Sequence, residues 1–150
     1  MNNKHIIAHM KSAFNYAECS TAEKMKVGCV LVKDDRIISI GYNGMPAGWT
    51  NQCETLSFFN EFGKQVPHPI LVTKPEVLHA EENAITKLAR SNESGEGATA
   101  FITHVPCLSC AKLLYSSGII EVWYKHPYKN TEGLDFLNEC MIKVNAYADN

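Results

Sequence analysis

"HAEENAI", residues 79–85, and "PCLSC", residues 106–110, are the two stretches around which the rest of the chain can be interpreted. The first continues as "HAEENAITKLARS", in which apolar residues recur at the spacing of a helix with one buried face. The second continues as "CLSCAKLLYSSG", which predicts a helix over residues 107–118 closed by Gly118. Each motif therefore opens a predicted helix.

The segments around these helices predict strands and further helices. Short β-rich runs predict strands at residues 98–103 and 119–124, and a hairpin of residues 27–32 and 36–42 that turns at Asp34 and Asp35. Apolar residues at helical spacing predict an opening helix that ends near Cys19 and a C-terminal helix from about Leu134 to Ala146. Residues 43–75 contain several Gly and Pro residues and are interpreted as one long irregular loop. This order predicts an α/β sandwich with a mixed sheet.

The composition is that of one globular domain spanning residues 1–150, without an internal linker. Of the 150 residues, 45% are hydrophobic and 20% are charged, which is enough to build a buried core. The net charge is −2, and Lys and Arg are scattered along the chain. We therefore expect no polymeric nucleic acid as a partner, whereas a small anionic ligand fits.

The N-terminal stretch "MNNKHIIAHMKSAF" is amphipathic and is interrupted by charges. It has no apolar run of the length that a signal peptide or a membrane span requires, so we expect a cytoplasmic protein without a membrane partner. In a reducing compartment, the six cysteines favour metal ligation or core packing over disulfides.

Cys107 and Cys110 are three residues apart at a predicted helix start, so both thiolates face one side and can bind one cation. With the imidazole of His79 they form a three-ligand set suited to zinc, which leaves a fourth tetrahedral position open, as in catalytic sites. Glu81 lies two residues beyond His79 and can reach a zinc-bound water. Water activation with a carboxylate as proton shuttle predicts hydrolytic deamination.

Each motif alone has another interpretation. A lone Cys-x-x-Cys is also typical of a redox pair or a structural zinc site, and His-Ala-Glu occurs by chance at helix starts. Together and in this order, His-x-Glu and Pro-Cys-x-x-Cys are typical of zinc-dependent nucleobase deaminases.

From about Ser20 to Tyr128 the sequence resembles the cytidine deaminase superfamily and, within it, the deoxycytidylate (dCMP) deaminases. The resemblance rests on "HAEENAI", on "THVPCLSCAKLLYSSGI" and on "VGCVLVKDDRIISIGYNGMPAG". The last of these is the most discriminating, because many deaminases share the zinc motif and far fewer have the Gly-Tyr-Asn-Gly-Met-Pro loop.

The resemblance implies a three-layer α/β/α sandwich around a five-stranded mixed sheet, with zinc on His79, Cys107 and Cys110. It implies that a zinc-bound hydroxide attacks C4 of cytosine and that Glu81 protonates N3 and then the leaving amine. The products would be dUMP, which feeds thymidylate synthesis, and ammonia. Two alternatives stay open: a deaminase of nucleosides or of adenosine in transfer RNA, and a noncatalytic zinc-stabilised module for nucleotide sensing.

Substrate residues are implied with the family. The resemblance suggests that Asn43 contacts the sugar and that Lys24, Lys26 and Tyr128 lie near the phosphate, where cationic and hydroxyl donors are needed. Asn43 could equally be a turn residue. Each lysine could equally be an ordinary solvated charge.

The resemblance also implies a homo-oligomer, with a hexamer favoured, that is activated by dCTP and inhibited by dTTP, each bound with Mg²⁺. Gly44, Asn83 and Arg90 match candidate positions of that allosteric site. Lys87 departs from the family pattern, because an aromatic residue is expected there, and this weakens the case for base stacking. Arg90 could equally be a surface charge near a helix C-terminus.

Phage-type relatives suggest a second, structural zinc. Cys19, Cys53 and His68 match three of its ligands, but Val77 stands where the fourth is expected. Cys29 and Cys140 are interpreted as small core residues.

Overall fold

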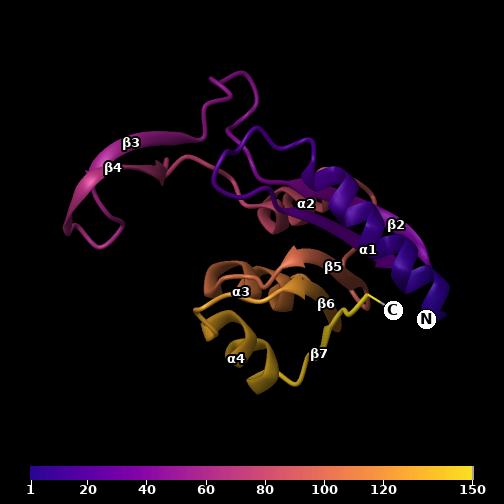
Figure 1. Ribbon diagram of the computed structural model, residues 1–150. Coiled ribbons are helices and arrows are strands. Elements are labelled where there is room, and N and C mark those ends of the chain that lie inside the picture. Colours follow the sequence, from indigo (N-terminus) through magenta and orange to yellow (C-terminus); the bar gives the residue numbers. More distant parts are fainter. Residues whose placement is uncertain (150) are drawn as a thin grey trace.

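The computed structural model describes residues 1–149, and Figure 1 shows the arrangement of its helices and strands. In chain order the elements are α1 (Asn3–Ala17), β1 (Gly28–Lys33), β2 (Arg36–Tyr42), β3 (Glu54–Phe59), β4 (Gln65–Thr73), α2 (Ala80–Ala89), β5 (Thr99–His104), α3 (Leu108–Ser116), β6 (Glu121–His126), α4 (Glu132–Glu139) and β7 (Lys143–Ala146). No helix among residues 1–149 has the length and the apolar character that crossing a membrane requires.

The five-stranded mixed sheet is confirmed. Its order is β2-β1-β5-β6-β7. Strand β1 pairs antiparallel with β2 and with β5, whereas β5, β6 and β7 are parallel. The carboxyl ends of β5 and β6 therefore meet at one edge of the sheet, where α3 and the segment after β6 begin.

Alternate residues of the central strands supply two cores, one on each face of the sheet. Leu31 and Ile102 pack in a cluster with residues of α2, α3 and α4. Val30 and Phe101 face the other way and pack with Met10 of α1. The sheet is thus covered on both faces, and the three-layer α/β/α sandwich predicted above is confirmed (Figure 1).

Local sequence signals located most elements to within two residues. The backbones of Asp34 and Asp35 have φ of 50° and 59°, the geometry of a tight hairpin turn in which Asp is tolerated. Gly118 has φ of 92° just after α3, which confirms that it closes this helix.

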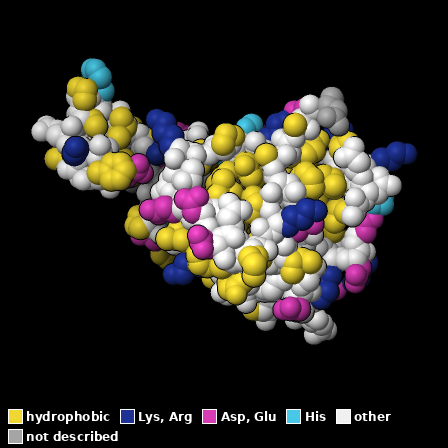
Figure 2. Space-filling view, turned by 90° about the horizontal axis from the view of Figure 1, so that it is seen from below, with side chains coloured by type: hydrophobic (Ala, Val, Ile, Leu, Met, Phe, Trp, Pro, Cys, Tyr) yellow, Lys and Arg dark blue, Asp and Glu magenta, His cyan; other side chains and the backbone are white. Residues whose placement is uncertain are grey.

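Two predictions of secondary structure were wrong. Residues 43–75 are not one irregular loop, because β3 and β4 form an antiparallel hairpin within them. A two-stranded ribbon leaves one edge of each strand unpaired, and an unpaired edge tolerates Pro67 and Pro69. Figure 2 shows this hairpin projecting from the body of the molecule with hydrophobic side chains on its surface.

The predicted C-terminal helix is the second error. Helix α4 ends at Glu139, and the chain then turns through Met141, which has φ of 58°, into strand β7. Apolar residues such as Leu137 and Val144 fit a helical period, but Val144 pairs with Val122 at the free edge of β6. Tertiary pairing has overridden the local pattern.

Two glycines allow the elements around the two motifs to approach closely. A Cβ on Gly41 in β2 would lie 2.2 Å from the carbonyl oxygen of Ala80, in the first turn of α2. A Cβ on Gly133 in α4 would lie 2.0 Å from the carbonyl oxygen of Pro106. The starts of α2 and α3 therefore pack against two backbone positions that leave no room for a side chain, so only glycine fits there.

Candidate active site

The starts of α2 and α3 bring one imidazole and two thiols together. His79 is the N-cap of α2, and Cys107 is the N-cap of α3. Nδ1 of His79 lies 3.6 Å from Sγ of Cys107 and 3.4 Å from Sγ of Cys110. The three donor atoms all lie within 4.8 Å of one another, and they form the one such group found among residues 1–149. This donor set suits Zn²⁺, which prefers sulfur and imidazole ligands in a tetrahedral arrangement.

The ionisation of the three side chains is coupled. Hydrogen bonds with Cys110 and His79 lower the pKa of the Cys107 thiol to about 4. The same contact with Cys107 raises the pKa of His79 to about 9, and Cys107 also raises the pKa of the Cys110 thiol above its usual range. A single thiolate is thus stabilised by protons on its two neighbours. A dication at the centre of the group would replace those protons and ionise both sulfurs.

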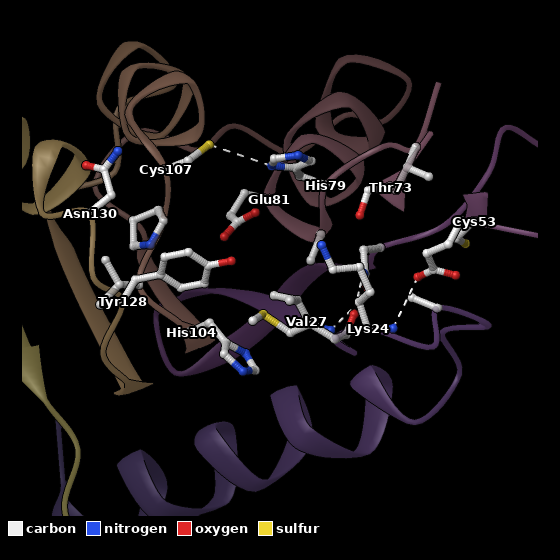
Figure 3. Close-up of a pocket in the computed structure, with 18 residues that line it drawn as sticks. Lys24, Val27, Cys53, Thr73, His79, Glu81, His104, Cys107, Tyr128 and Asn130 are labelled. Carbon is white, nitrogen blue, oxygen red and sulfur yellow. Dashed lines mark hydrogen bonds between the residues drawn. The ribbon is translucent and has the colours of Figure 1, made fainter. Parts of the chain in front are cut away.

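Glu81 is buried beside this group. It is 4% exposed, and burial raises the pKa of its carboxyl above the usual range. Figure 3 shows the carboxylate pointing into the cavity between His79, Cys107 and Tyr128. A carboxylate in this position can exchange a proton with a small molecule bound in the cavity, as general acid–base catalysis requires.

The cavity has a volume of about 300 Å³ and joins these residues to three other parts of the chain. One wall comes from the loop between α1 and β1, with Lys24, and another comes from the root of the β3–β4 hairpin, with Glu54. A third wall is the carboxyl end of β5 and the segment after β6, which contributes Tyr128 (Figure 3).

Comparison with known proteins agrees with this geometry. The sequence model described as "Cytidine and deoxycytidylate deaminase zinc-binding region" matches residues 3–126. The chain belongs to the cytidine and deoxycytidylate deaminase family. The donor set of His79, Cys107 and Cys110 fits the zinc-binding character of this family.

Similar deaminases come from several phages. The deoxycytidylate deaminase of Enterobacteria phage T4 is 34% identical over 155 residues, covering 84% of this chain and 80% of that protein. That of Mycobacterium phage D29 is 38% identical over 112 residues, covering 72% of this chain and 84% of that protein. The crystal structure of dCMP deaminase from cyanophage S-TIM5 in complex with dCMP and dUMP matches with a TM-score of 0.85 at 37% identity, over 98% of this chain and 99% of that one.

Three of the four predicted substrate residues of this deaminase-family chain line the cavity. They are Lys24, Asn43 and Tyr128. The phenol oxygen of Tyr128 points into the cavity (Figure 3). Lys26 is not among the lining residues, and its ammonium lies 4.0 Å from Glu18 at the surface.

Asn43 also organises the loop that carries Lys24. Its Oδ1 accepts a hydrogen bond from the backbone N–H of Val27 at 2.8 Å, and its Nδ2 donates to the carbonyl of Met25 at 2.8 Å. Ser20 adds a hydrogen bond from its hydroxyl to the carbonyl of Asn43. The loop is therefore fixed to the end of β2.

The three predicted allosteric residues lie around the end of β2 and along α2. Gly44 exchanges two backbone hydrogen bonds with Leu78, just before His79. Nδ2 of Asn83 donates to the carbonyl of Tyr42 at 2.8 Å. Arg90 is exposed at the C-terminal end of α2. The Gly-Tyr-Asn-Gly loop is thus tied directly to the helix that begins at the candidate zinc ligand.

The predicted ligands of a second zinc do not come together. Cys53 is buried against Ala22 and Val77, which form a small apolar cluster where a fourth ligand would be needed. Cys19 is exposed at the end of α1, and His68 lies on the projecting hairpin. Among the side chains that the structure describes, no metal-binding group contains these three residues. As predicted, Cys29 is buried in the core, whereas Cys140 is only half-buried at the end of α4.

Sequence reasoning missed several lining residues. His104 ends β5 opposite His126 of β6, and a signal for it existed, because parallel strands place their carboxyl ends at one edge. Asn130 follows in the segment after β6. Glu54 had no signal, because it lies in a stretch that was interpreted as an irregular loop.

His104 predicts a pH dependence of stability. Burial, with a smaller contribution from His126, lowers the pKa of His104 to about 4, compared with about 6.5 in an unfolded chain. The neutral ring therefore contributes its full stabilisation above about pH 6.5, and this contribution is lost as the pH falls toward 4. Because the ring is partly exposed, we expect about 1 kcal/mol of unfolding free energy to be lost through it between pH 7 and pH 5.

Urea unfolding at the two pH values, with chelator present throughout, measures this loss. The variant His104→Gln should show a shallower pH dependence by about that amount, whereas His68→Gln on the exposed hairpin should match the wild type. Identical pH dependence in His104→Gln and the wild type would contradict the assignment.

Proposed function

We propose that this chain is a dCMP deaminase that converts dCMP and water to dUMP and ammonia, with one zinc ion held by His79, Cys107 and Cys110. One observation carries the proposal. Two members of the convergent donor group, His79 and Cys107, line one cavity of about 300 Å³ together with the buried Glu81 and the cationic Lys24. The similarity to deoxycytidylate deaminases over most of the chain supports dCMP as the substrate.

The chain's own residues then have defined tasks. Zn²⁺ at the donor group would supply Lewis acidity, which makes a water molecule nucleophilic near neutral pH. Glu81 accepts one proton from the attacking water and delivers it to N3 of the cytosine ring. It then takes the remaining proton of the new C4 hydroxyl and delivers it to the amino group, so that the C4–N bond breaks, ammonia leaves and C4 becomes a carbonyl. The burial of Glu81 excludes bulk water, so the proton is transferred within the cavity.

The 5′-phosphate is bound by donors from two different walls of the cavity. Lys24 provides an ammonium and Tyr128 a hydroxyl, and Asn43 holds the Lys24 loop in place next to the sugar. Lys26, with its ammonium near Glu18, is the weaker candidate for a phosphate contact.

The two lysines form a matched pair for testing phosphate recognition. Lys24→Ala is expected to raise KM for dCMP about 10- to 100-fold, because it removes a charge-assisted hydrogen bond, whereas Lys26→Ala should change KM by less than about 2-fold. With deoxycytidine, which has no phosphate, neither variant should change KM. Equal effects of both substitutions, or an equal loss on deoxycytidine, would argue against this phosphate site.

The overall proposal is tested with free substrates. The purified protein is incubated with dCMP, dCTP, deoxycytidine and cytidine, and the loss of cytosine absorbance is followed. We expect rapid loss with dCMP. Rapid loss with deoxycytidine alone would favour the nucleoside deaminase, and no loss with any of the four would favour the noncatalytic module.

We further propose that dCTP activates and dTTP inhibits the enzyme, each with Mg²⁺, at Gly44, Asn83 and Arg90. The hydrogen bonds from Asn83 to Tyr42 and between Gly44 and Leu78, just before α2, support this proposal, since a ligand there would act directly on the helix that begins at His79. The dCMP assay repeated with each nucleotide and Mg²⁺ tests it.

We also propose a single domain over residues 1–150 that assembles as a homohexamer in the cytoplasm and supplies dUMP for thymidylate synthesis. Large apolar side chains exposed on the hairpin and on α3 support assembly, because another copy of the chain could bury them. They include Leu56, Phe58, Phe62, Leu113 and Tyr115. Light scattering coupled to gel filtration measures the mass of the assembly.

A further inference from the structure

Glu54, the first residue of β3, is a buried carboxylate in the wall of the cavity. It is 4% exposed and lines the same cavity as His79 and Glu81. Its Oε1 accepts hydrogen bonds from the backbone N–H groups of Glu23 at 3.0 Å and Lys24 at 3.2 Å. One oxygen of Glu54 therefore fixes the middle of the loop that carries Lys24.

The second oxygen, Oε2, has no hydrogen bond to any residue in the range 1–149. No buried side-chain oxygen in that range lacks a partner, so Oε2 must retain access to solvent through the cavity. Glu54 also has no ion pair with a Lys, Arg or His among the described residues. When a bound molecule displaces the solvent from the cavity, Oε2 gains from a donor on that molecule, because an unpaired buried oxygen is costly.

The chemistry of Oε2 restricts what it can bind. A carboxylate oxygen only accepts hydrogen bonds, and it repels a phosphate. In dCMP the base must reach Glu81, and the phosphate carries no hydroxyl group to donate when it is ionised. The deoxyribose has one hydroxyl, at the 3′ position, and that group is the one donor on the sugar.

Asn43 does not meet this need, although it lies at the same cavity. Its Oδ1 already accepts the N–H of Val27, and its Nδ2 already donates to the carbonyl of Met25. The amide can still donate its second hydrogen to a sugar oxygen, but the hydroxyl proton requires a different acceptor.

We infer that Oε2 of Glu54 accepts a hydrogen bond from the 3′-hydroxyl of the substrate sugar. This inference rests on the proposed deamination of dCMP, and it adds a residue that recognises the sugar of the substrate. The two oxygens of Glu54 then link sugar binding to the position of the Lys24 loop. A substrate without a 3′-hydroxyl would leave Oε2 unpaired in a filled cavity.

The test compares dCMP with its 3′-deoxy analogue, 2′,3′-dideoxycytidine 5′-monophosphate, in the wild type and in Glu54→Gln. We expect the wild type to lose about 10- to 100-fold in kcat/KM on the analogue, the range for a hydrogen bond to a charged group. Glu54→Gln should lose a similar factor on dCMP and less than about 3-fold more on the analogue, because the two changes remove the same contact. Glu61→Gln, an exposed carboxylate of the same hairpin, should behave as the wild type.

Zinc content and melting temperature show whether the variant is folded. If Glu54→Gln does not fold, Glu54→Asp keeps the charge and withdraws the carboxylate by one methylene, and it should also lose the discrimination between the two substrates.

A purely structural Glu54 predicts equal losses on both substrates in the variant, and this result would overturn the inference. A wild type that deaminates both substrates equally well would also overturn it, whatever the variants do. A wild type active on deoxycytidine but not on dCMP would refute the proposed function instead, and the same comparison would then use 2′,3′-dideoxycytidine.

Discussion

Glu81→Gln is expected to lower kcat for dCMP by about 10²- to 10⁴-fold while leaving the zinc content at one ion per chain. The amide has nearly the size and shape of the carboxylate, so the buried site keeps its packing, but it cannot accept the proton of the attacking water. The measurement is steady-state kinetics by loss of cytosine absorbance, together with elemental analysis of the same preparation.

The neighbouring Glu82→Gln is the matched control. Oε1 of Glu82 accepts the backbone N–H of His79 at 2.9 Å, and a glutamine carbonyl can accept the same bond. We expect this variant to retain kcat within about 3-fold, because a helix cap contributes to stability rather than to proton transfer. A Glu81→Gln enzyme that keeps more than about a tenth of the wild-type kcat would exclude Glu81 as the proton shuttle.

Cys110→Ser is expected to abolish zinc binding and, with it, detectable deamination. Cys110 is buried with its sulfur 3.4 Å from Nδ1 of His79, and a serine hydroxyl at this place neither ionises near neutral pH nor provides a soft ligand. The remaining imidazole and single thiolate should not retain the ion through gel filtration. Elemental analysis and the dCMP assay measure both consequences.

Cys19→Ser tests whether the chain has the second, structural zinc site that the resemblance suggests. Cys19 is exposed, and the structure does not bring it together with Cys53 and His68, so we expect full zinc content and full activity in the variant. If Cys19→Ser reduced the zinc content from two ions per chain to one, the single-zinc account would be wrong.

The parts of the fold that were predicted from sequence have short-range causes. The β-rich runs that form β1 and β5 and the Asp34–Asp35 turn are set by neighbouring residues, and so are the helix starts at His79 and Cys107. The convergence of these two starts could also be predicted, because the spacing of the zinc ligands requires it. Gly41 and Gly133, which allow the close approach, had no role in that prediction and were recognised from the structure.

The errors arise where distant contacts decide. Val144 fits a helical pattern but pairs with the free edge of β6. The Pro content of residues 43–75 indicated a loop, but the pairing of β3 with β4 makes both segments strands. Lys24 and Lys26 are equivalent in sequence, and only the path of the loop directs one toward the cavity and the other toward Glu18. Glu54 was missed for the same reason, since its partners lie about thirty residues earlier in the chain.

The central claim is that a single zinc ion at His79, Cys107 and Cys110 activates the water that attacks dCMP. The most direct measurement follows the zinc content and the dCMP deamination rate of one preparation as a chelator removes the metal and added Zn²⁺ restores it. The account predicts one zinc per chain, with activity that falls and recovers in proportion to it. Full deamination by protein that contains no zinc would contradict it.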